Sequence, residues 1–439
     1  MRSMFRSFAT FNFRVWFVGV LVSNVGTWME STAQSWVVLT QLTDNDAGAM
    51  GVTMALQFAP PLVLVSVTGW VADRFDRRRV LLVTQSALLL LSIALAVLLL
   101  TGVMTLGLMY VLALVLGVVN AFDNPARQAF VSDLVGSENA SNAVALNSAS
   151  FNTARMIGPA VAGLLIVVIG SGWVFLVNAV TFLAMITALL LIRPHELVRR
   201  ARVGERSGLA EGFRYVRRRH DLLVAFTLVF LLGAFGMNFP IFASTMALEF
   251  GQDADGFGIL SSVFAVGSLA GALLAARRER ARLRVVILAL GGFAISLLAS
   301  SFAPWYWSYA VLLVFVGFAA ITVLTTANGY VQTTTEPALR GRVLAIYVAI
   351  LMGGTPFGAP IVGALASGLG PRAAMMISAA VCAVAWAIGG TWLLVSGRLH
   401  RHPERRFALR LDETRPIPIV PPAADGTAGD PGLRPRPAA

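Results

Sequence analysis

The chain has 439 residues, of which 57% are hydrophobic and 13% charged, and its formal net charge is +12. Soluble domains carry about 25% charged residues, so this composition excludes an ordinary soluble protein, and the hydrophobic content excludes disorder for most of the chain. The single cysteine, Cys382, excludes a disulfide-stapled secreted protein. The basic residues are all arginines placed between long apolar runs, which favours membrane topology over nucleic-acid binding.

The expected membrane spans are marked by stretches without a formally charged residue, since a spanning helix needs about 20 apolar residues. In chain order these stretches are 47–72, 80–122, 156–192, 222–248, 256–276, 285–335, 343–371 and 373–397. Those long enough for two helices are 80–122, 156–192 and 285–335. With a first helix from about residue 13, the sequence predicts an all-α polytopic membrane protein with twelve transmembrane helices.

These helices are predicted to form two pseudo-symmetric six-helix halves. The expected divisions are an N-terminal half at 1–192, a cytoplasmic central loop at 193–221, a C-terminal half at 222–397 and a disordered cytoplasmic tail at 398–439. Nearly all arginines fall on one side of this topology; the exceptions are Arg127, Arg155 and Arg372. The positive-inside rule therefore predicts that both termini are cytoplasmic.

A weak internal repeat supports the two halves. Asn124 to Gln128 recurs as Asn328 to Gln332, and a Gly and Pro pattern recurs about half a membrane domain later. The members of that second pattern are Gly158, Pro159 and Gly163, then Gly358, Pro360 and Gly363. Parallel halves of this kind place a substrate site between them, near the membrane midplane.

The connection between the second and third predicted helices carries a motif. It reads Gly69-Trp-Val-Ala-Asp73-Arg74-Phe-Asp76-Arg77-Arg78-Arg79. A positive-inside loop would explain the arginines but not Gly69 and Asp73. Gly69 would allow close approach of two helices, and Asp73 would lie against a helix N-terminus. Here the chain resembles the major facilitator superfamily, whose signature reads G-x-x-x-D-R-x-G-R-R. Asp76 replaces the second glycine of that signature.

Within the superfamily, the chain resembles the transmembrane secretion effector group, which includes enterobactin-exporter-like efflux proteins. The matching segments are Trp16, Ser23 to Trp28, Asp123 to Phe130, Ala143 to Asn147 and Ala154 to Pro159. Gly158 and Pro159 also resemble the helix 5 motif of drug:proton antiporters, with Gly163 in place of a glycine pair. The resemblance implies export across a bacterial inner membrane.

Four ionisable positions inside the predicted spans are candidates for coupling or gating, because charge in a bilayer is costly. Glu30, about 17 residues into the first helix, is either a proton carrier or a residue at the outer water interface. Asp123 is a second proton-coupling candidate, and it shares a helix face with Arg127, four residues on. Arg155 is expected nearby as a third member. This set is either a gate or proton-coupled switch, or a static ion pair.

Aromatic and polar residues of the first and seventh predicted helices suggest a cavity for amphipathic molecules. The candidates are Trp28, Trp36, Phe235, Asn238 and Phe239. Gly236 and Pro240 lie beside the last three, and breaks there would permit rocking of the two halves. The alternative is ordinary packing against lipid or core.

Other chemistry is not indicated. No Cys and His set has metal spacing and no phosphate-binding loop is present, so no metal, no cofactor and no enzyme activity are expected. The sequence predicts a monomeric secondary active efflux transporter that exchanges protons for drugs, macrolide-like molecules or siderophores by alternating access. Its expected partners are this cargo, protons and membrane lipids, without nucleic acid. The alternatives are an importer of a small metabolite and a transport-dead membrane sensor or scaffold.

Overall fold

The computed structural model describes residues 6–136, 138–198, 209–278, 281–396, 399–401 and 409–411. Its elements in chain order are η1 (Arg6–Ala9), α1 (Phe11–Thr40), α2 (Ala47–Val63), α3 (Val65–Arg74), α4 (Arg77–Leu100), α5 (Leu106–Asp133), α6 (Ala140–Ile169), α7 (Ser171–Leu191), η2 (Pro194–Glu196), α8 (Leu209–Arg218), α9 (His220–Leu231), η3 (Leu232–Gly236), α10 (Phe239–Glu249), α11 (Ala254–Ala276), α12 (Leu283–Ser301), α13 (Tyr306–Thr334), α14 (Arg340–Leu369), α15 (Pro371–Val395), β1 (Leu399–Arg401) and β2 (Leu409–Leu411).

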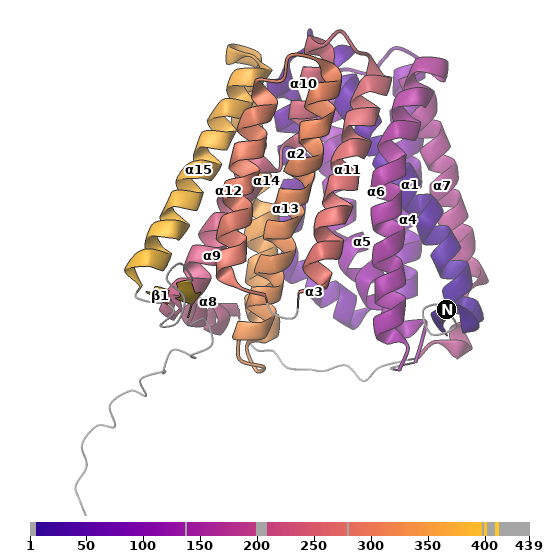
Figure 1. Cartoon of the computed structure of the whole chain (residues 1–439). Helices are drawn as coiled ribbons and strands as arrows, with labels where there is room; N and C mark the ends of the chain where they lie inside the picture. Colours follow the sequence, from indigo (N-terminus) through magenta and orange to yellow (C-terminus); the bar gives the residue numbers. More distant parts are fainter. Residues whose placement is uncertain are drawn as a thin grey trace, which may run out of the picture. The chain divides into compact units, whose positions relative to one another are not determined.

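The protein is an all-α bundle that spans a membrane several times (Figure 1), as the composition predicts. Ten helical segments in the described ranges are long and apolar enough to cross a bilayer, with α9, η3 and α10 counted as one segment. The 17-residue α2 is a shorter apolar helix, and α1 is 30 residues long but does not meet the same standard. The count of twelve spans therefore stays a prediction, whereas the polytopic helical class is confirmed.

Residues up to Leu393 form one compact unit, and Leu394 onward is a second, separate one. In the second unit the described residues are the end of α15 and the strands β1 and β2, which pair antiparallel with Leu399 opposite Leu411. These strands lie in the range 398–439, for which no regular structure is predicted from the sequence. α8 lies in the range predicted as a central loop, because a helix with several arginines in ten residues has no apolar run to mark it.

The internal repeat is visible in the backbone as well as in the residues. α6 and α14 both have 30 residues, and each begins and ends 200 positions from its counterpart. Each ends at a glycine with positive φ, 89° at Gly170 and 88° at Gly370. A left-handed conformation of this kind favours glycine, which has no Cβ. The next helix, α7 or α15, follows directly, so the two hairpins have the same turn.

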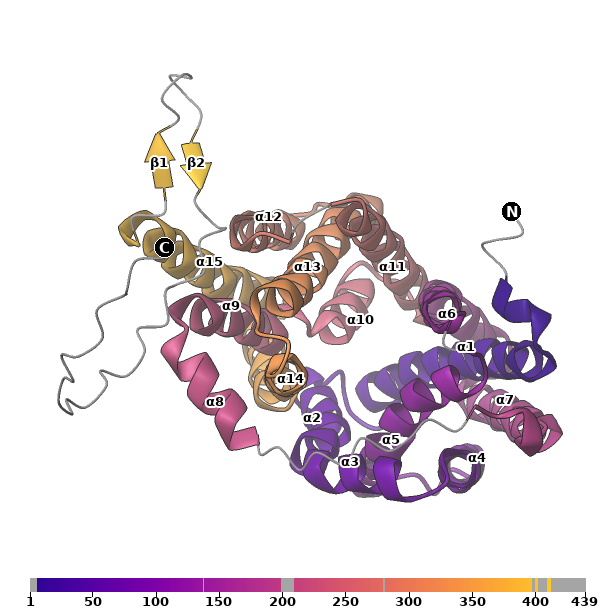
Figure 2. The same cartoon turned by 90° about the horizontal axis from the view of Figure 1, so that it is seen from below.

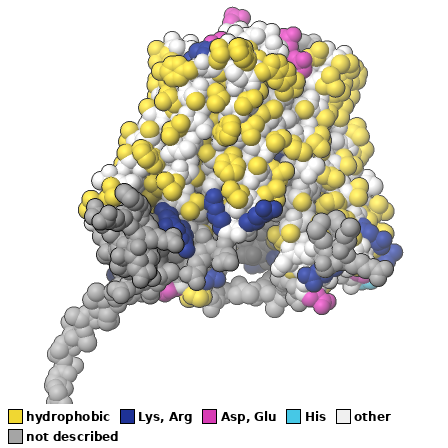
Figure 3. Space-filling view, viewed as in Figure 1, with side chains coloured by type: hydrophobic (Ala, Val, Ile, Leu, Met, Phe, Trp, Pro, Cys, Tyr) yellow, Lys and Arg dark blue, Asp and Glu magenta, His cyan; other side chains and the backbone are white. Residues whose placement is uncertain are grey.

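The two ends of the bundle differ in charge (Figure 3). We call the end where α4, α9 and α14 begin the arginine-rich end, and the end where α2, α11 and α15 begin the arginine-poor end. Large apolar side chains such as Leu90, Leu164 and Ile295 are exposed on the flanks between the two ends. A bilayer would solvate these side chains, so the exposed apolar flank is what a membrane-spanning bundle requires.

The two halves meet along two seams, α2 against α14 and α6 against α11 (Figure 2). Small residues allow the backbones to touch near the arginine-poor end. A Cβ at Gly163 of α6 would overlap the carbonyl oxygen of Ala254, and one at Gly363 of α14 would overlap that of Ala47. Such close approach through glycine is typical of helix association in membranes. Both seams are therefore closed at the arginine-poor end.

A hydrogen-bonded link closes the first seam at its outer edge. Asp46 caps α2 by accepting from the Gly48 amide at 2.8 Å, and the Ser367 hydroxyl of α14 donates to the same carboxylate at 2.6 Å. Ser367 Oγ also accepts from the Gly48 amide at 3.0 Å. The hydrogen bond from Ser367 lowers the pKa of the Asp46 carboxyl below its usual range. The link therefore favours the ionised form of Asp46.

Replacing Ser367 by Ala is expected to lower the apparent Tm of the purified protein by about 1–2 °C at pH 7, because one partly exposed hydrogen bond is lost. Since the folded pKa is depressed, the contribution of the link is fully present above the unfolded value of about 3.9 and is lost as the pH falls through the lower folded value. The Tm difference should therefore stay constant above about pH 4 and shrink as the pH is lowered further in melting experiments. Asp44→Asn, a nearby exposed change, is the control. A difference that does not shrink at acid pH would contradict the assignment.

Candidate functional site

Glu30 is buried between α1, α4 and α7, with only 4% of its surface exposed. Its Oε2 accepts hydrogen bonds from Asn178 Nδ2 of α7 and from Ser92 Oγ of α4, the latter at 3.4 Å. Its Oε1 is buried and has no hydrogen-bond partner among the described residues. α1 continues to Thr40, so the helix does not end early at Glu30 and the residue does not lie at a water interface.

The surroundings of Glu30 are polar but neutral. In the described part of the chain, no arginine forms an ion pair with this carboxylate. A buried carboxylate without a cation is costly when charged, whereas a proton removes the charge. The carboxylate therefore has neutral hydrogen-bond donors but no described cation to balance a charge.

Asp123 and Arg127 of α5 form the predicted ion pair, with Arg127 Nε 3.0 Å from Asp123 Oδ2. Thr84 and Gln85 of α4 donate to the other carboxylate oxygen at 2.7 and 2.8 Å. Arg127 Nη1 also donates to Asn24 Oδ1 of α1 at 3.3 Å. Asp123 is 2% exposed, and the Arg127 side chain is 14% exposed. The ion pair and its hydrogen bonds link α1, α4 and α5, and Asp123 Oδ1 accepts from two donors.

Replacing Asp123 by Asn is expected to destabilise the protein by about 3 kcal/mol, because a mostly buried guanidinium loses its carboxylate. The Asn side chain can still accept the hydrogen bonds from Thr84 and Gln85, so the loss of stability measures the ion pair with Arg127. The double variant Asp123→Asn with Arg127→Met should recover much of that loss, which a double-mutant cycle on chemical unfolding in detergent would measure. Equal stability of the single and double variants would contradict an ion pair of this strength.

Arg155 does not join this pair, contrary to the sequence-based expectation. Its guanidinium lies over two aromatic rings, 5.5 Å from the centroid of Trp28 and 5.5 Å from that of Phe264 of α11. In the described ranges, no carboxylate pairs with Arg155. The side chain therefore contacts α1 through Trp28 and α11 through Phe264. Helix rotation, which the spacing of residues does not contain, sets this direction.

Two of the predicted cavity aromatics stack on rings of α11. Trp36 stacks on Phe257 of α11, with ring centroids 6.1 Å apart, and Phe239 stacks on Phe264 at 4.1 Å. Asn238 is buried; its amide donates to the Ala234 carbonyl at 2.5 Å, while its Oδ1 is unpaired among described residues. Phe235 lies in the π-helical turn η3, which breaks the seventh predicted span as Gly236 and Pro240 suggested. Such turns occur often at functional sites.

The connection between α3 and α4 binds its arginines into the bundle. Arg77 forms an ion pair with Asp133 at the end of α5 at 2.8 Å, and Arg78 Nε donates to the Leu189 carbonyl of α7 at 2.8 Å. Arg74 lies 5.7 Å from the Trp70 ring centroid. Asp76 caps α4 by accepting from the Arg79 amide at 3.0 Å, so the turn forms without the second glycine of the signature.

One residue of this motif, Gly69, does not show the expected contact. No heavy atom among the described residues lies within 4 Å of the position of a Cβ at Gly69, so this glycine makes no close helix contact here. The side chain of Asp73 lies outside the described part of the structure. The helix 5 motif, in contrast, lies at close contacts: a Cβ at Gly158 would lie 2.6 Å from the Trp28 Cβ, and Pro159 contacts Gly258 of α11 through its carbonyl.

Comparison with known proteins places this arrangement in a family. A family model described as "Transmembrane secretion effector" matches residues 2–411. The chain belongs to the transmembrane secretion effector family. It is 24% identical over 331 residues to the staphyloferrin A transporter of Staphylococcus aureus, which covers 73% of this chain and 81% of that protein. It is 27% identical over 344 residues to the enterobactin exporter EntS of Shigella flexneri, covering 77% and 81%.

Solved structures show the same fold. A bacterial homologue of the human lysosomal transporter Spinster, in an inward-facing and unoccupied conformation, matches with a TM-score of 0.68 at 14% identity, covering 89% of this chain and 99% of that one. A D-xylose–proton symporter matches with a TM-score of 0.67 at 14% identity, covering 86% and 96%. The family match and these structures agree that the chain has the family and the fold of major facilitator superfamily transporters.

Several residues that contact the candidate site residues were not predicted from the sequence. They are Asn178 and Ser92 beside Glu30, Thr84 and Gln85 beside Asp123, and Asp133 beside Arg77. One signal was present: Gln85 and Ser92 are seven residues apart, two helical turns, and both are fully buried. Polar residues at this spacing in an apolar helix indicate an internal face. Among described residues, no group of His, Cys, Asp and Glu side chains is placed to hold a metal ion.

Proposed function

We propose that this transmembrane secretion effector is a proton-driven exporter in a bacterial inner membrane. It exchanges protons for a lipophilic or amphipathic compound by alternating access of its two halves. The names of its relatives, an enterobactin exporter and a staphyloferrin A transporter, support a siderophore-like cargo. Drugs and macrolide-like molecules share the same amphipathic character. The arginine-rich end faces the cytoplasm, in keeping with the positive-inside rule.

The observation that carries proton coupling is the burial of Glu30 among neutral donors. In one conformation the carboxyl is protonated and sealed between α1, α4 and α7. A change in helix packing that admits water lets it release the proton. Because a charged Glu30 is tolerated only when hydrated, proton loss and conformation are linked.

The cargo class is supported by Arg155 and its aromatic neighbours. A guanidinium that faces Trp28 and Phe264, with no described carboxylate partner, offers a positive charge beside flat apolar surfaces at the contact of the halves. That combination suits an amphipathic anion with aromatic or extended apolar parts. With both seams closed at the arginine-poor end, the proposed exporter takes up its cargo from the arginine-rich end.

Accumulation in cells that lack their own efflux pumps tests this function. Cells with the native chain should accumulate less of at least one compound from a panel of a cationic dye, a macrolide, a catecholate siderophore and a carboxylate siderophore. A protonophore should abolish the difference, as should Glu30→Gln or Asp73→Asn at matched expression. Arg155→Gln should weaken transport of the anionic compounds more than of the dye, and Arg155→Lys should restore part of it.

Two outcomes would overturn the proposal. Higher accumulation than in empty cells would indicate an importer, and no change for any compound at confirmed expression would favour a sensor or scaffold. Inside-out vesicles separate direction from expression effects, because an exporter concentrates its cargo inside them when they are acidified.

A further inference from the structure

A groove of about 850 Å³ lies at the arginine-rich end between α8, α9 and α14. Its apolar part includes Phe230 and Leu231 of α9 and Ile350 of α14. Arg214 and Arg217 of α8 line the same groove. They are one turn apart and therefore lie on one face of that helix. The groove thus combines a deep apolar surface with two positive charges at one edge.

The position of α8 beside this groove is set by its contacts with α14. Gly212 lies so close to α14 that a Cβ there would be 3.0 Å from the Cβ of Arg342. Glu211 forms an ion pair with Arg342. α8 is therefore docked on α14, and the buried Val216 and the exposed Arg214 and Arg217 line the groove beside this contact.

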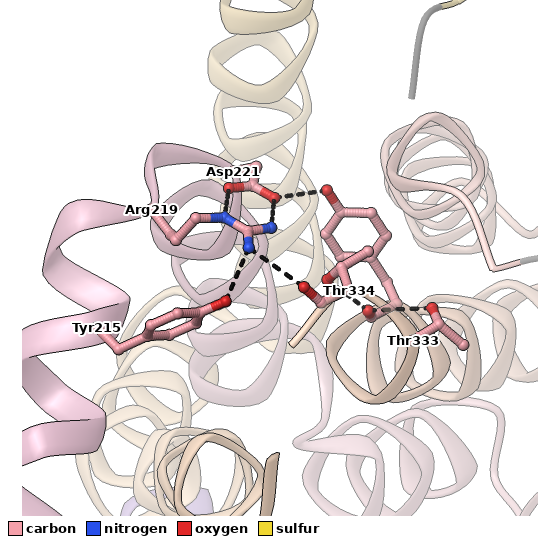
Figure 4. A network of polar contacts seen from close by, with 6 residues as sticks. Tyr215, Arg219, Asp221, Thr333 and Thr334 are labelled. Atoms are coloured by element: carbon pink, nitrogen blue, oxygen red, sulfur yellow. Dashed lines mark hydrogen bonds and ion pairs between the residues drawn. The ribbon is translucent and has the colours of Figure 1, made fainter. Parts of the chain in front are cut away.

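A second set of contacts fixes the junction between α8 and α9 (Figure 4). Arg219 donates to both oxygens of Asp221 at 2.8 and 2.7 Å, and Asp221 accepts from the Tyr330 hydroxyl of α13 at 2.7 Å. Arg219 also donates to the Tyr215 hydroxyl at 3.0 Å and to the Thr334 carbonyl at 3.2 Å. This network neutralises Arg219 and holds α8 at one angle to the bundle.

The two groove arginines have no comparable partner. Neither Arg214 nor Arg217 forms an ion pair with a residue that the structure describes, although Glu211 and Asp221 lie on or next to the same helix. Both side chains are exposed. A ligand for this groove therefore needs negative charge at the α8 edge and a long apolar part that lies along α9 and α14.

We propose that this groove binds an anionic phospholipid of the surrounding bilayer, with its phosphate at Arg214 and Arg217 and an acyl chain against Phe230, Leu231 and Ile350. The groove is open to the outside, since its lining residues Phe213 and Leu223 are 58% and 37% exposed. A lipid reaches such an open groove directly. The assignment does not depend on the cargo, the direction of transport or proton coupling.

Binding of fluorescent lipids to the purified full chain in phosphatidylcholine nanodiscs tests this site. Labelled phosphatidylglycerol should bind with saturation, and labelled phosphatidylcholine should not. Each arginine near an anionic headgroup contributes about fivefold in affinity, so Arg217→Gln should weaken binding about fivefold and Arg214→Gln with Arg217→Gln about 30-fold. Arg218→Gln is the matched control: it is the adjacent residue, is equally exposed and does not line the groove. It should change binding less than twofold.

Two further variants separate the charge from the groove. Arg217→Lys keeps the charge and should retain most of the binding, while Ile350→Trp fills the apolar part and should weaken binding with every charge in place. Equal losses for Arg217→Gln and Arg218→Gln would show nonspecific attraction and overturn the proposal. So would glycerol phosphate or a soluble anionic cargo that displaces the lipid at equal affinity, because neither has an acyl chain.

Discussion

Replacing Glu30 by Gln is expected to abolish proton-driven transport while cargo exchange without a proton gradient continues. Gln is similar in size and keeps a carbonyl oxygen for Asn178 and Ser92, but it cannot release a proton. A transporter with this change resembles the permanently protonated native chain. In proteoliposomes, transport driven by an imposed pH difference should fall at least tenfold. Counterflow of labelled cargo against unlabelled cargo should stay within about threefold of native.

Two controls make this result specific to Glu30. Ser92→Ala removes one neutral donor and leaves the carboxylate, so proton-driven transport should fall by less than threefold. Asp123→Asn tests the rival proton-binding residue, whose carboxylate is already paired with Arg127. Full proton-driven transport by Glu30→Gln would exclude Glu30 as a carrier. Loss of driven transport and unchanged counterflow in Asp123→Asn would assign the role to that residue instead.

The second large effect is expected for Gly363→Leu in the seam between α2 and α14. A side chain there would overlap the Ala47 carbonyl, so the seam could not close at the arginine-poor end. Transport should fall at least tenfold because alternating access requires that closure. A cysteine in place of Ser244 detects whether the seam stays open. Ser244 is buried in α10, and its Oγ lies 3.5 Å from Met50 Sδ of α2. With Cys382→Ala as background, Ser244→Cys should become reactive to a membrane-impermeant maleimide.

The same helix provides the control for this prediction. Gly368 lies five residues further along α14, and no neighbouring atom of the described residues is within 4 Å of the position of a Cβ there. Gly368→Leu makes the same change in helix propensity without a clash, so transport and labelling should stay native. Native transport by Gly363→Leu would mean that the closed seam of this structure is not part of the cycle.

Much of the fold could be predicted because membrane spans depend on the absence of charge, which a sequence displays directly. The spans at α4, α12 and α15 are of this kind. α1 was less apparent, since Asn12, Gln34 and Glu30 reduce its apolar character although all three are buried. α8 was missed because its arginines resemble a charged loop, and its stability comes from docking against α14, a tertiary contact that local patterns do not contain.

The candidate site could be predicted only where its residues lie close together in the chain. Asp123 and Arg127 are four residues apart on one helix, so the spacing predicts their contact. Asn178 meets Glu30 across 148 positions, and no local pattern indicates that contact. Arg155 was placed wrongly for a related reason. Its helix, α6, packs against both α1 and α11, and only the rotation of α6 decides which side chains Arg155 reaches.

The matched turns at Gly170 and Gly370 have a consequence for how this protein arose. Two 30-residue helices with the same backbone turn and a constant offset of 200 residues retain an ancestral hairpin without insertion or deletion. The ancestor implied by this duplication is a chain half as long, with one such hairpin. Two copies of it, related by a twofold axis along the membrane normal, would form both seams from identical surfaces. The differences between the halves, such as Glu30 in only one of them, are then specialisations that followed fusion into one gene.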